Sequence, residues 1–128
     1  MKKADNQKKC ILIVDDDKDM RHLYSSFFSG DERYEIDTAS GGKAGYGKLK
    51  EKKYDLVILD MIMEDMAGDS LFAAVQKDSK NTDTPVIVVS VLCISDNAVD
   101  FILRRKNTGY LKKPIIREQL FDKVELFL

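Results

Sequence analysis

Short apolar runs that end at a polar residue recur along this chain. Cys10–Val14 is followed by a run of aspartates, Leu56–Leu59 by Asp60, and Val86–Val89 by Ser90. Runs of this length that are rich in Val, Ile and Leu are typical of strands buried on both faces of a parallel sheet. The pattern therefore predicts three central strands, each with a hydrophilic residue at its carboxyl end.

Other segments complete an alternation of strands and helices. Tyr34–Ala39 alternates apolar and polar residues, which predicts a strand with one solvated side at the edge of the sheet. Apolar residues at helical spacing and one further short run predict the remaining elements. These are helices within Met20–Phe28, Ala44–Leu49, Leu71–Val75, Val99–Leu103 and Leu120–Phe127, and a last strand at Gly109–Leu111.

Five β-α units in one chain predict an α/β fold. Right-handed crossovers would fold them into a flavodoxin-like, doubly wound (βα)5 sandwich with a parallel five-stranded sheet of order 2-1-3-4-5. The length of 128 residues suits one domain. We expect residues 1–9 to form a polar tail and residues 10–128 to form that domain.

In that strand order, carboxylates from two strand ends meet at one crevice. Asp15, Asp16 and Asp60 would lie together although they are far apart in sequence. Carboxylates that repel each other persist where they hold a cation, and an all-oxygen set that leaves room for water suits Mg²⁺. Capping of the first helix is the alternative role for these aspartates, and it suffices for Asp17.

Two more strand ends add groups suited to phosphoryl chemistry. Ser90 ends the fourth strand with a hydroxyl, and Lys113 lies just beyond the fifth. Taken singly, they would be a turn residue and a surface lysine. Together, a lysine and a hydroxyl aimed at the same crevice could stabilise the charge on phosphoryl oxygens.

These residues resemble a known family in both type and order. The markers are ILIVDD (11–16), LVILDMIMEDMAG (56–68), VIVVS (86–90) and GYLKKP (109–114). The chain from residue 10 to residue 128 resembles the receiver domain of two-component response regulators. The resemblance implies that Asp60 accepts a phosphoryl group from a histidine kinase or a histidine phosphotransfer protein.

The resemblance also implies a metal site. Asp16 and Asp60 would ligate Mg²⁺ directly, the backbone carbonyl of Ile62 would be a third protein ligand, and Asp15 would act through water. Lys113 would pair with the acceptor and then with the phosphate. The peptide bond between Lys113 and Pro114 is expected to be cis.

A conformational switch is the third implication of the resemblance. Ser90 would move to hydrogen-bond the phosphate, and the ring of Tyr110 would change its burial as Ser90 moves. The output would be a changed surface on the fourth helix, fifth strand and fifth helix, recognised by a downstream protein or an attached output domain. Homodimerisation on phosphorylation is an additional expectation. The domain would catalyse only its own phosphorylation and dephosphorylation.

Charge and cysteine content limit the other functions. The formal net charge is −1, so no overall attraction to nucleic acid is expected. No apolar run is long enough for membrane insertion. The two cysteines, Cys10 and Cys93, have no metal-site spacing, and a reducing, cytoplasmic location is expected.

Three alternatives remain at this point. Gly42–Leu49 (GKAGYGKL) nearly matches a nucleotide-binding phosphate loop, but Leu49 stands where the Ser or Thr hydroxyl is needed. A receiver-like interaction module that is never phosphorylated would not require the acidic set, the hydroxyl and the lysine together. Flavin binding on the same fold would need a hydroxyl-rich loop after the first strand, which this chain lacks.

Overall fold

Five parallel strands form the centre of the protein. The computed structural model describes residues 8–61, 68–78, 80–90, 104 and 107–128. The sheet has the order β2-β1-β3-β4-β5, and every pairing is parallel. The strands are β1 (Lys9–Val14), β2 (Tyr34–Ala39), β3 (Leu56–Asp60), β4 (Val86–Ser90) and β5 (Thr108–Lys112). The predicted strand order and the edge position of β2 are therefore confirmed.

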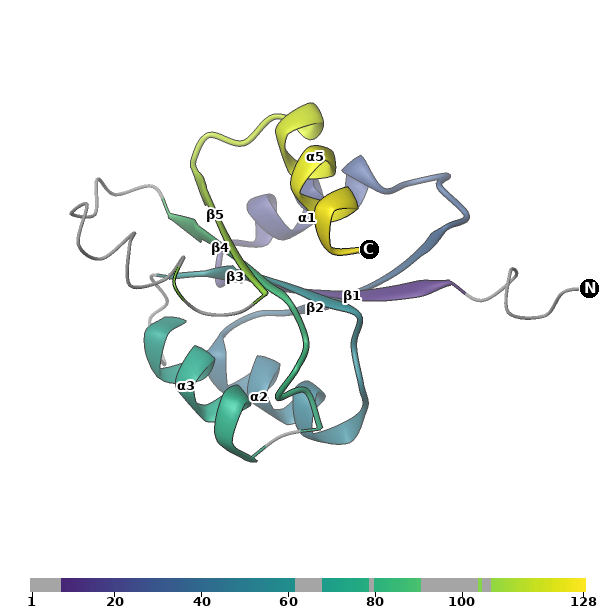
Figure 1. Ribbon diagram of the computed structural model, residues 1–128. Helices are drawn as coiled ribbons and strands as arrows, with labels where there is room; N and C mark the ends of the chain where they lie inside the picture. Colours follow the sequence, from purple (N-terminus) through teal and green to yellow (C-terminus); the bar gives the residue numbers. More distant parts are fainter. Residues whose placement is uncertain (1–7, 62–67, 79, 91–103, 105–106) are drawn as a thin grey trace, which may run out of the picture.

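Helices cover both faces of the sheet (Figure 1). On one face lie α1 (Lys18–Phe27) and α5 (Arg117–Phe127), and on the other lie α2 (Gly42–Glu51) and α3 (Gly68–Asp78). The helix expected at Val99–Leu103 and most of the polar tail lie outside the described residues. The described layers are those of the predicted doubly wound sandwich.

Each face of the sheet has its own apolar cluster, because successive strand residues point to opposite sides. On the α2–α3 side, Leu12 and Val14 of β1 pack with Leu59 of β3. On the α1–α5 side, Ile13 of β1 packs with Ile58 of β3. All five side chains are at most 1 % exposed, so the central strands are buried on both faces as their composition predicts.

Helix α1 starts at the acidic end of β1. Asp17 is its N-cap, and the Asp17 carboxylate accepts hydrogen bonds from the backbone N–H groups of Asp19 and Met20. The capping role predicted for Asp17 is therefore confirmed. Leu23 shares the apolar spacing that predicted this helix, which would place it on the packed face, but this position is wrong: Leu23 is 39 % exposed, and the packed face of α1 centres on Tyr24 instead.

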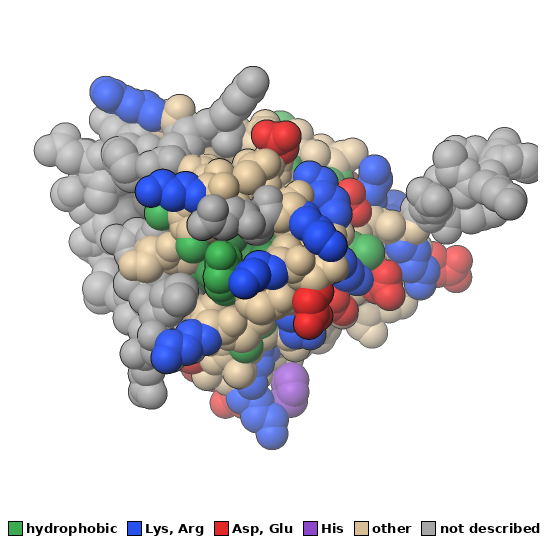
Figure 2. Space-filling view, turned by 90° about the horizontal axis from the view of Figure 1, so that it is seen from below, with side chains coloured by type: hydrophobic (Ala, Val, Ile, Leu, Met, Phe, Trp, Pro, Cys, Tyr) green, Lys and Arg blue, Asp and Glu red, His purple; other side chains and the backbone are tan. Residues whose placement is uncertain are grey.

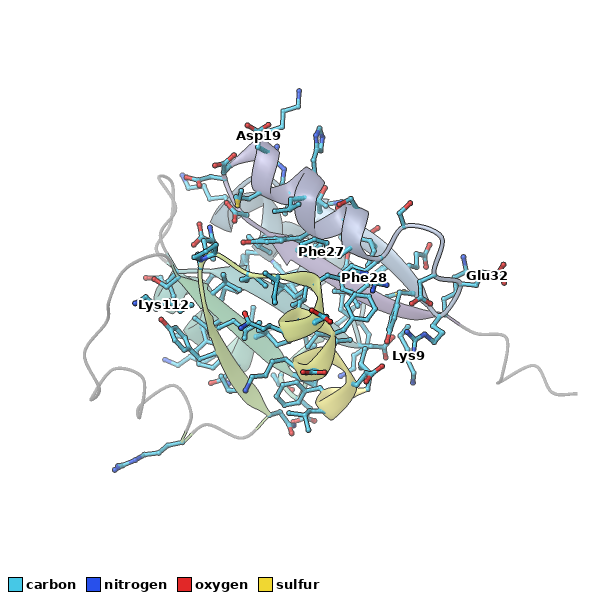
Figure 3. The ribbon with its side chains drawn as sticks, turned by 90° about the horizontal axis from the view of Figure 1, so that it is seen from above. Lys9, Asp19, Phe27, Phe28, Glu32 and Lys112 are labelled. Carbon is cyan, nitrogen blue, oxygen red and sulfur yellow. The ribbon has the colours of Figure 1, made fainter. Side chains whose placement is uncertain are left out.

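The far end of α1 packs on α5 through aromatic rings. Phe28 stacks on Phe121 of α5 with ring centroids 5.0 Å apart, and Tyr34 of β2 meets Phe28 edge-on at 5.3 Å. Figure 3 shows Asp19 at one end of α1, with Phe27 and Phe28 at the end next to α5. The aromatic contacts fix the carboxyl end of α1 against α5. The Asp17 cap fixes the amino end of α1 next to the carboxyl end of β1.

Helix α2 resolves the phosphate-loop alternative. Gly42–Leu49 lies entirely within α2, so its glycines do not form a loop that could wrap a phosphate. A Cβ at Gly45 would lie only 3.0 Å from a methyl group of Val14, so this glycine lets α2 approach β1 closely. The glycine pattern reflects packing of α2 on the sheet and not nucleotide binding.

The α2–α3 face carries many cations (Figure 2). Lysine and arginine side chains gather there, with carboxylates among them. Lys43 and Lys50 of α2 are exposed, consistent with a solvated helix face. Among the described residues, no helix has the length and apolar character that crossing a membrane requires.

Candidate functional site

Three carboxylates converge where β1 and β3 end. These strands are neighbours, with Val14 paired with Leu59, and each is followed or ended by an aspartate. One oxygen from each of Asp15, Asp16 and Asp60 lies within 4.8 Å of the others. The structure therefore brings together the acidic set predicted from the two apolar runs.

Burial differs within this acidic set. Asp15 is 1 % exposed and Asp60 is 7 % exposed, whereas Asp16 is exposed. The buried pair faces the protein interior, and Asp16 faces solvent. Two buried carboxylates lose much of their hydration, so they require positive charge or hydrogen-bond donors nearby.

Lys113 supplies a positive charge to the buried pair. Its Nζ lies 3.2 Å from Oδ2 of Asp15 and 3.8 Å from Oδ1 of Asp60. The Lys113 side chain is only 14 % exposed. Its backbone N–H donates to the carbonyl oxygen of Ser90 at 2.8 Å, which fixes the turn after β5 against the end of β4. The peptide bond between Lys113 and Pro114 is cis, as expected.

Ser90 lies at the end of the strand next to β3. Asp60 is paired with Val89, so Ser90 follows directly beside the acidic set, and it is 1 % exposed. Tyr110 of β5 is half-buried and pairs with Val88, two residues before Ser90. Ser90 and Tyr110 therefore lie on the same face of adjacent strands. The third expected ligand, the carbonyl of Ile62, lies outside the described residues.

Two groups that the sequence pattern does not indicate hold Asp15. Nη1 of Arg21 donates to the backbone carbonyl of Asp15 at 2.8 Å, and the backbone N–H of Asp17 donates to Oδ1 of Asp15 at 2.9 Å. Arg21 lies one helical turn after the Asp17 cap, and this spacing could have suggested that its side chain returns to the strand end. The Asp17 N–H orients the Asp15 carboxylate, and Arg21 holds the backbone of Asp15 at the strand end.

Tyr24 lies within the first predicted helix, and the sequence pattern gives it no role beyond the apolar spacing of that helix. It is 2 % exposed, and its hydroxyl has no hydrogen-bond partner among the described residues. Burial, followed by the negative charges of Asp15 and Asp60, raises the pKa of Tyr24 above its usual value. The phenol therefore remains protonated and able to donate a hydrogen bond.

The donor set fits a small, hard cation. All three side chains offer carboxylate oxygens, the ligands that Mg²⁺ prefers, and no thiolate or imidazole belongs to the group. The exposed position of Asp16 leaves one side accessible to water, which Mg²⁺ usually retains. The three carboxylates also carry enough negative charge to offset a divalent ion in the presence of Lys113.

The sequence matches a family model and several known proteins. The model of the response regulator receiver domain family matches residues 11–125. The regulatory protein VanRB of Enterococcus faecalis is 29 % identical over 118 residues, which are 92 % of this chain and 51 % of VanRB. The chain thus spans about half the length of this relative.

Solved structures agree with the sequence match. The chemotaxis protein CheY4 of Vibrio cholerae superposes with a TM-score of 0.85 at 27 % identity, over 95 % of this chain and 100 % of CheY4. The response regulator TrrA of Thermotoga maritima, solved in complex with Mg²⁺-BeF, gives a TM-score of 0.78 at 32 % identity, over 94 % and 99 % of the two chains. Family match, strand order and acidic set agree, and the chain belongs to the response regulator receiver domain family.

Proposed function

We propose that this chain is a phosphorelay receiver that accepts a phosphoryl group on Asp60 from a phosphohistidine of a histidine kinase or a histidine phosphotransfer protein. The observation that carries the proposal is the position of Asp60. It ends the central strand β3 beside Asp15, within an acidic set that Lys113 contacts. Oδ1 of Asp60 lies 3.8 Å from Nζ of Lys113, close enough for the lysine charge to act on it.

The transfer is a displacement at phosphorus. A carboxylate oxygen of Asp60 attacks the phosphorus atom, the P–N bond to the donor imidazole breaks, and its electron pair stays on the imidazole nitrogen. The product is an acyl phosphate on Asp60. Lys113 lies close enough to exchange its contact with Asp60 for one with a phosphoryl oxygen, and its charge stabilises the charge that develops there.

Asp15, Asp16 and Asp60 are the residues that would hold Mg²⁺ in this site. When bound, the ion offsets the carboxylate charge and polarises the phosphoryl oxygens. Arg21 and the Asp17 N–H keep Asp15 oriented for this role. The structure of TrrA with Mg²⁺-BeF supports the proposal by similarity, because a receiver of the same fold binds that pair.

Ser90 and Tyr110 form the proposed switch. A phosphoryl group on Asp60 adds acceptor oxygens beside the end of β4, and states in which the Ser90 hydroxyl donates to them are favoured. Tyr110 lies diagonally across from Ser90 on the same face of the sheet, and its half-buried ring can respond to that movement. The changed surface would include β5 and α5.

The proposed output partner is a downstream protein or an attached domain that contacts the surface of β5 and α5. Lys112 at the end of β5 is exposed on this surface and could meet a protein or an attached domain. Homodimerisation through the same surface on phosphorylation is part of the proposal, as is a cytoplasmic location with the kinase. Direct binding of nucleic acid is not proposed, since the chain has a net charge of −1.

The test is intact-mass analysis after incubation with acetyl phosphate. Wild-type protein with Mg²⁺ is expected to gain the mass of one phosphoryl group, whereas Asp60→Asn and a magnesium-free sample gain none. Asp17→Asn is the matched control, because Asp17 belongs to the same acidic run but caps α1. An adduct that forms equally in Asp60→Asn would contradict the proposal, and no adduct in any sample would favour a module that works without phosphorylation.

A further inference from the structure

A buried tyrosine hydroxyl lies on the interior side of the acidic set. Tyr24 of α1 is 2 % exposed and belongs to the apolar cluster between the sheet and α1–α5. Its hydroxyl is the one buried side-chain oxygen or nitrogen among the described residues that has no hydrogen-bond partner. Burial of a hydroxyl without a hydrogen-bond partner costs free energy of folding. An acceptor near the hydroxyl, such as a buried water, is therefore expected.

Strand alternation places the carboxylates next to this tyrosine. Tyr24 packs in the same cluster as Ile13 and Ile58, which precede Asp15 and Asp60 by two residues. Side chains two positions apart share a face of the sheet, and the N–H of Asp15 continues the ladder by donating to Ala39 at 3.2 Å. On the α1–α5 face of the sheet, Asp15 and Asp60 are therefore the next side chains after Ile13 and Ile58, which belong to the same cluster as Tyr24.

The position of Tyr24 on α1 directs its phenol toward the carboxyl ends of β1 and β3. Tyr24 lies seven residues after the Asp17 cap, about 10 Å along the axis, and helical side chains lean toward the amino terminus of their helix. The ring therefore points back toward the strand ends. The rise in the pKa of Tyr24, caused by burial and then by the charges of Asp15 and Asp60, agrees with this direction.

We propose that Tyr24 is a positioning residue of the acidic site, whose hydroxyl donates a hydrogen bond from the protein interior to one buried water that bridges it to the carboxylates of Asp15 and Asp60. Lys113 contacts the same pair from the end of β5. With donors from two directions, the pair keeps a fixed orientation for the cation and for attack on phosphorus. This inference rests on the proposed function, because it assigns a role in the same site.

The test compares two tyrosine-to-phenylalanine variants. Tyr24→Phe removes only the hydroxyl, and Tyr34→Phe is the matched control, because Tyr34 is buried in the same cluster but packs on Phe28 and Phe121. Loss of a group that orients metal ligands typically weakens metal binding by a factor of ten or more, so calorimetry with Mg²⁺ alone should show a dissociation constant roughly 10-fold higher for Tyr24→Phe. Tyr34→Phe should remain within about 2-fold of wild type by the same reasoning.

A spectroscopic measurement on unmodified protein provides a second readout. In protein labelled with ¹³C at the tyrosine ζ carbon, addition of Mg²⁺ should shift the Tyr24 resonance and leave the Tyr34 resonance in place. The Tyr24 signal is assigned by its absence in Tyr24→Phe or, if that variant does not fold, in Tyr24→Leu. This readout requires neither phosphorylation nor a folded phenylalanine variant during the titration.

The outcomes separate the two proposals. Weaker Mg²⁺ binding confined to Tyr24→Phe, with a Tyr24 resonance that responds to Mg²⁺, would support the positioning role. Equal effects of Tyr24→Phe and Tyr34→Phe, or a Tyr24 resonance that ignores Mg²⁺, would overturn it. A wild-type protein that binds Mg²⁺ with a Tyr24 response but takes no phosphoryl group would refute the proposed function and leave the role of Tyr24 supported.

Discussion

Asp60→Asn should stabilise the protein when divalent cations are absent. Asp60 is 7 % exposed, and one of its oxygens lies within 4.8 Å of oxygens of Asp15 and Asp16. The contact with Lys113 at 3.8 Å offsets only part of this repulsion. Among the charges of the described residues, replacing Asp60 with the isosteric amide removes the repulsions by Asp15 and Asp16 and the attraction to Lys113, and the balance of these three sets the expected sign.

The magnitude can be estimated from the distances. At an effective dielectric constant of about 20, two like charges at the upper limit of 4.8 Å repel by about 3.5 kcal/mol, and the Lys113 contact at 3.8 Å contributes about 4.4 kcal/mol of attraction. Two repulsions and one attraction leave about 2.5 kcal/mol of net repulsion on Asp60. Solvent around the exposed Asp16 screens part of it, so the expected gain is about 1–2 kcal/mol.

Urea unfolding in the presence of a chelator measures this gain. A gain of this size corresponds to a rise in melting temperature of roughly 4–8 °C for a domain of this length. Asp17→Asn is the control, because asparagine also caps helices, and it should change the unfolding free energy by less than about 1 kcal/mol. An Asp60→Asn protein that is less stable than wild type under these conditions would refute the electrostatic reasoning. Addition of Mg²⁺ should then stabilise wild type more than Asp60→Asn, since the ion binds the folded state.

Three further predictions concern stability. Asn81 is fully buried and makes four hydrogen bonds under the loops that follow α2 and α3, so Asn81→Ala should lower the unfolding free energy by about 3–5 kcal/mol in urea titrations. Burial opposes ionisation of Asp37, but the Tyr54 hydrogen bond and the Lys52 charge outweigh it and lower the Asp37 pKa. The stabilisation from Asp37 is therefore complete above the unfolded pKa of about 3.9 and lost as the pH falls through the lower folded value, so the deficit of Asp37→Asn should shrink below about pH 4. Gly45→Ala should destabilise by about 1–3 kcal/mol in thermal unfolding, because its Cβ would lie 3.0 Å from a Val14 methyl group.

Much of the fold could be predicted because burial leaves a clear pattern. A strand covered on both faces must be apolar at every position, as Leu56–Leu59 is, whereas the edge strand Tyr34–Ala39 alternates. The strand order and the right-handed crossovers then bring Asp15, Asp60 and Lys113 together. These site residues could be predicted because each lies at or just beyond a strand end, where the topology alone fixes its position.

Other features depend on side-chain packing that the sequence pattern does not encode. Leu23 and Tyr24 both match the apolar spacing of α1, yet Leu23 is 39 % exposed, and the buried hydroxyl of Tyr24 has no hydrogen-bond partner in the described part of the chain. Gly45 looks unfavourable for a helix until its distance to Val14 is known. Tyr54, Leu49 and Lys52, which share hydrogen bonds with the Asn81 side chain, lie 27 to 32 residues before it, so no local pattern identifies Asn81 as the residue that joins two loops.

The most direct test of the account is to locate the phosphoryl group on the chain. Protein treated with acetyl phosphate and Mg²⁺ is reduced with borohydride, which converts an acyl phosphate into homoserine, and its peptides are sequenced by tandem mass spectrometry. The account predicts homoserine at Asp60 and unmodified aspartate at Asp15, Asp16 and Asp17. Homoserine at one of those three positions, with Asp60 unmodified, would contradict it.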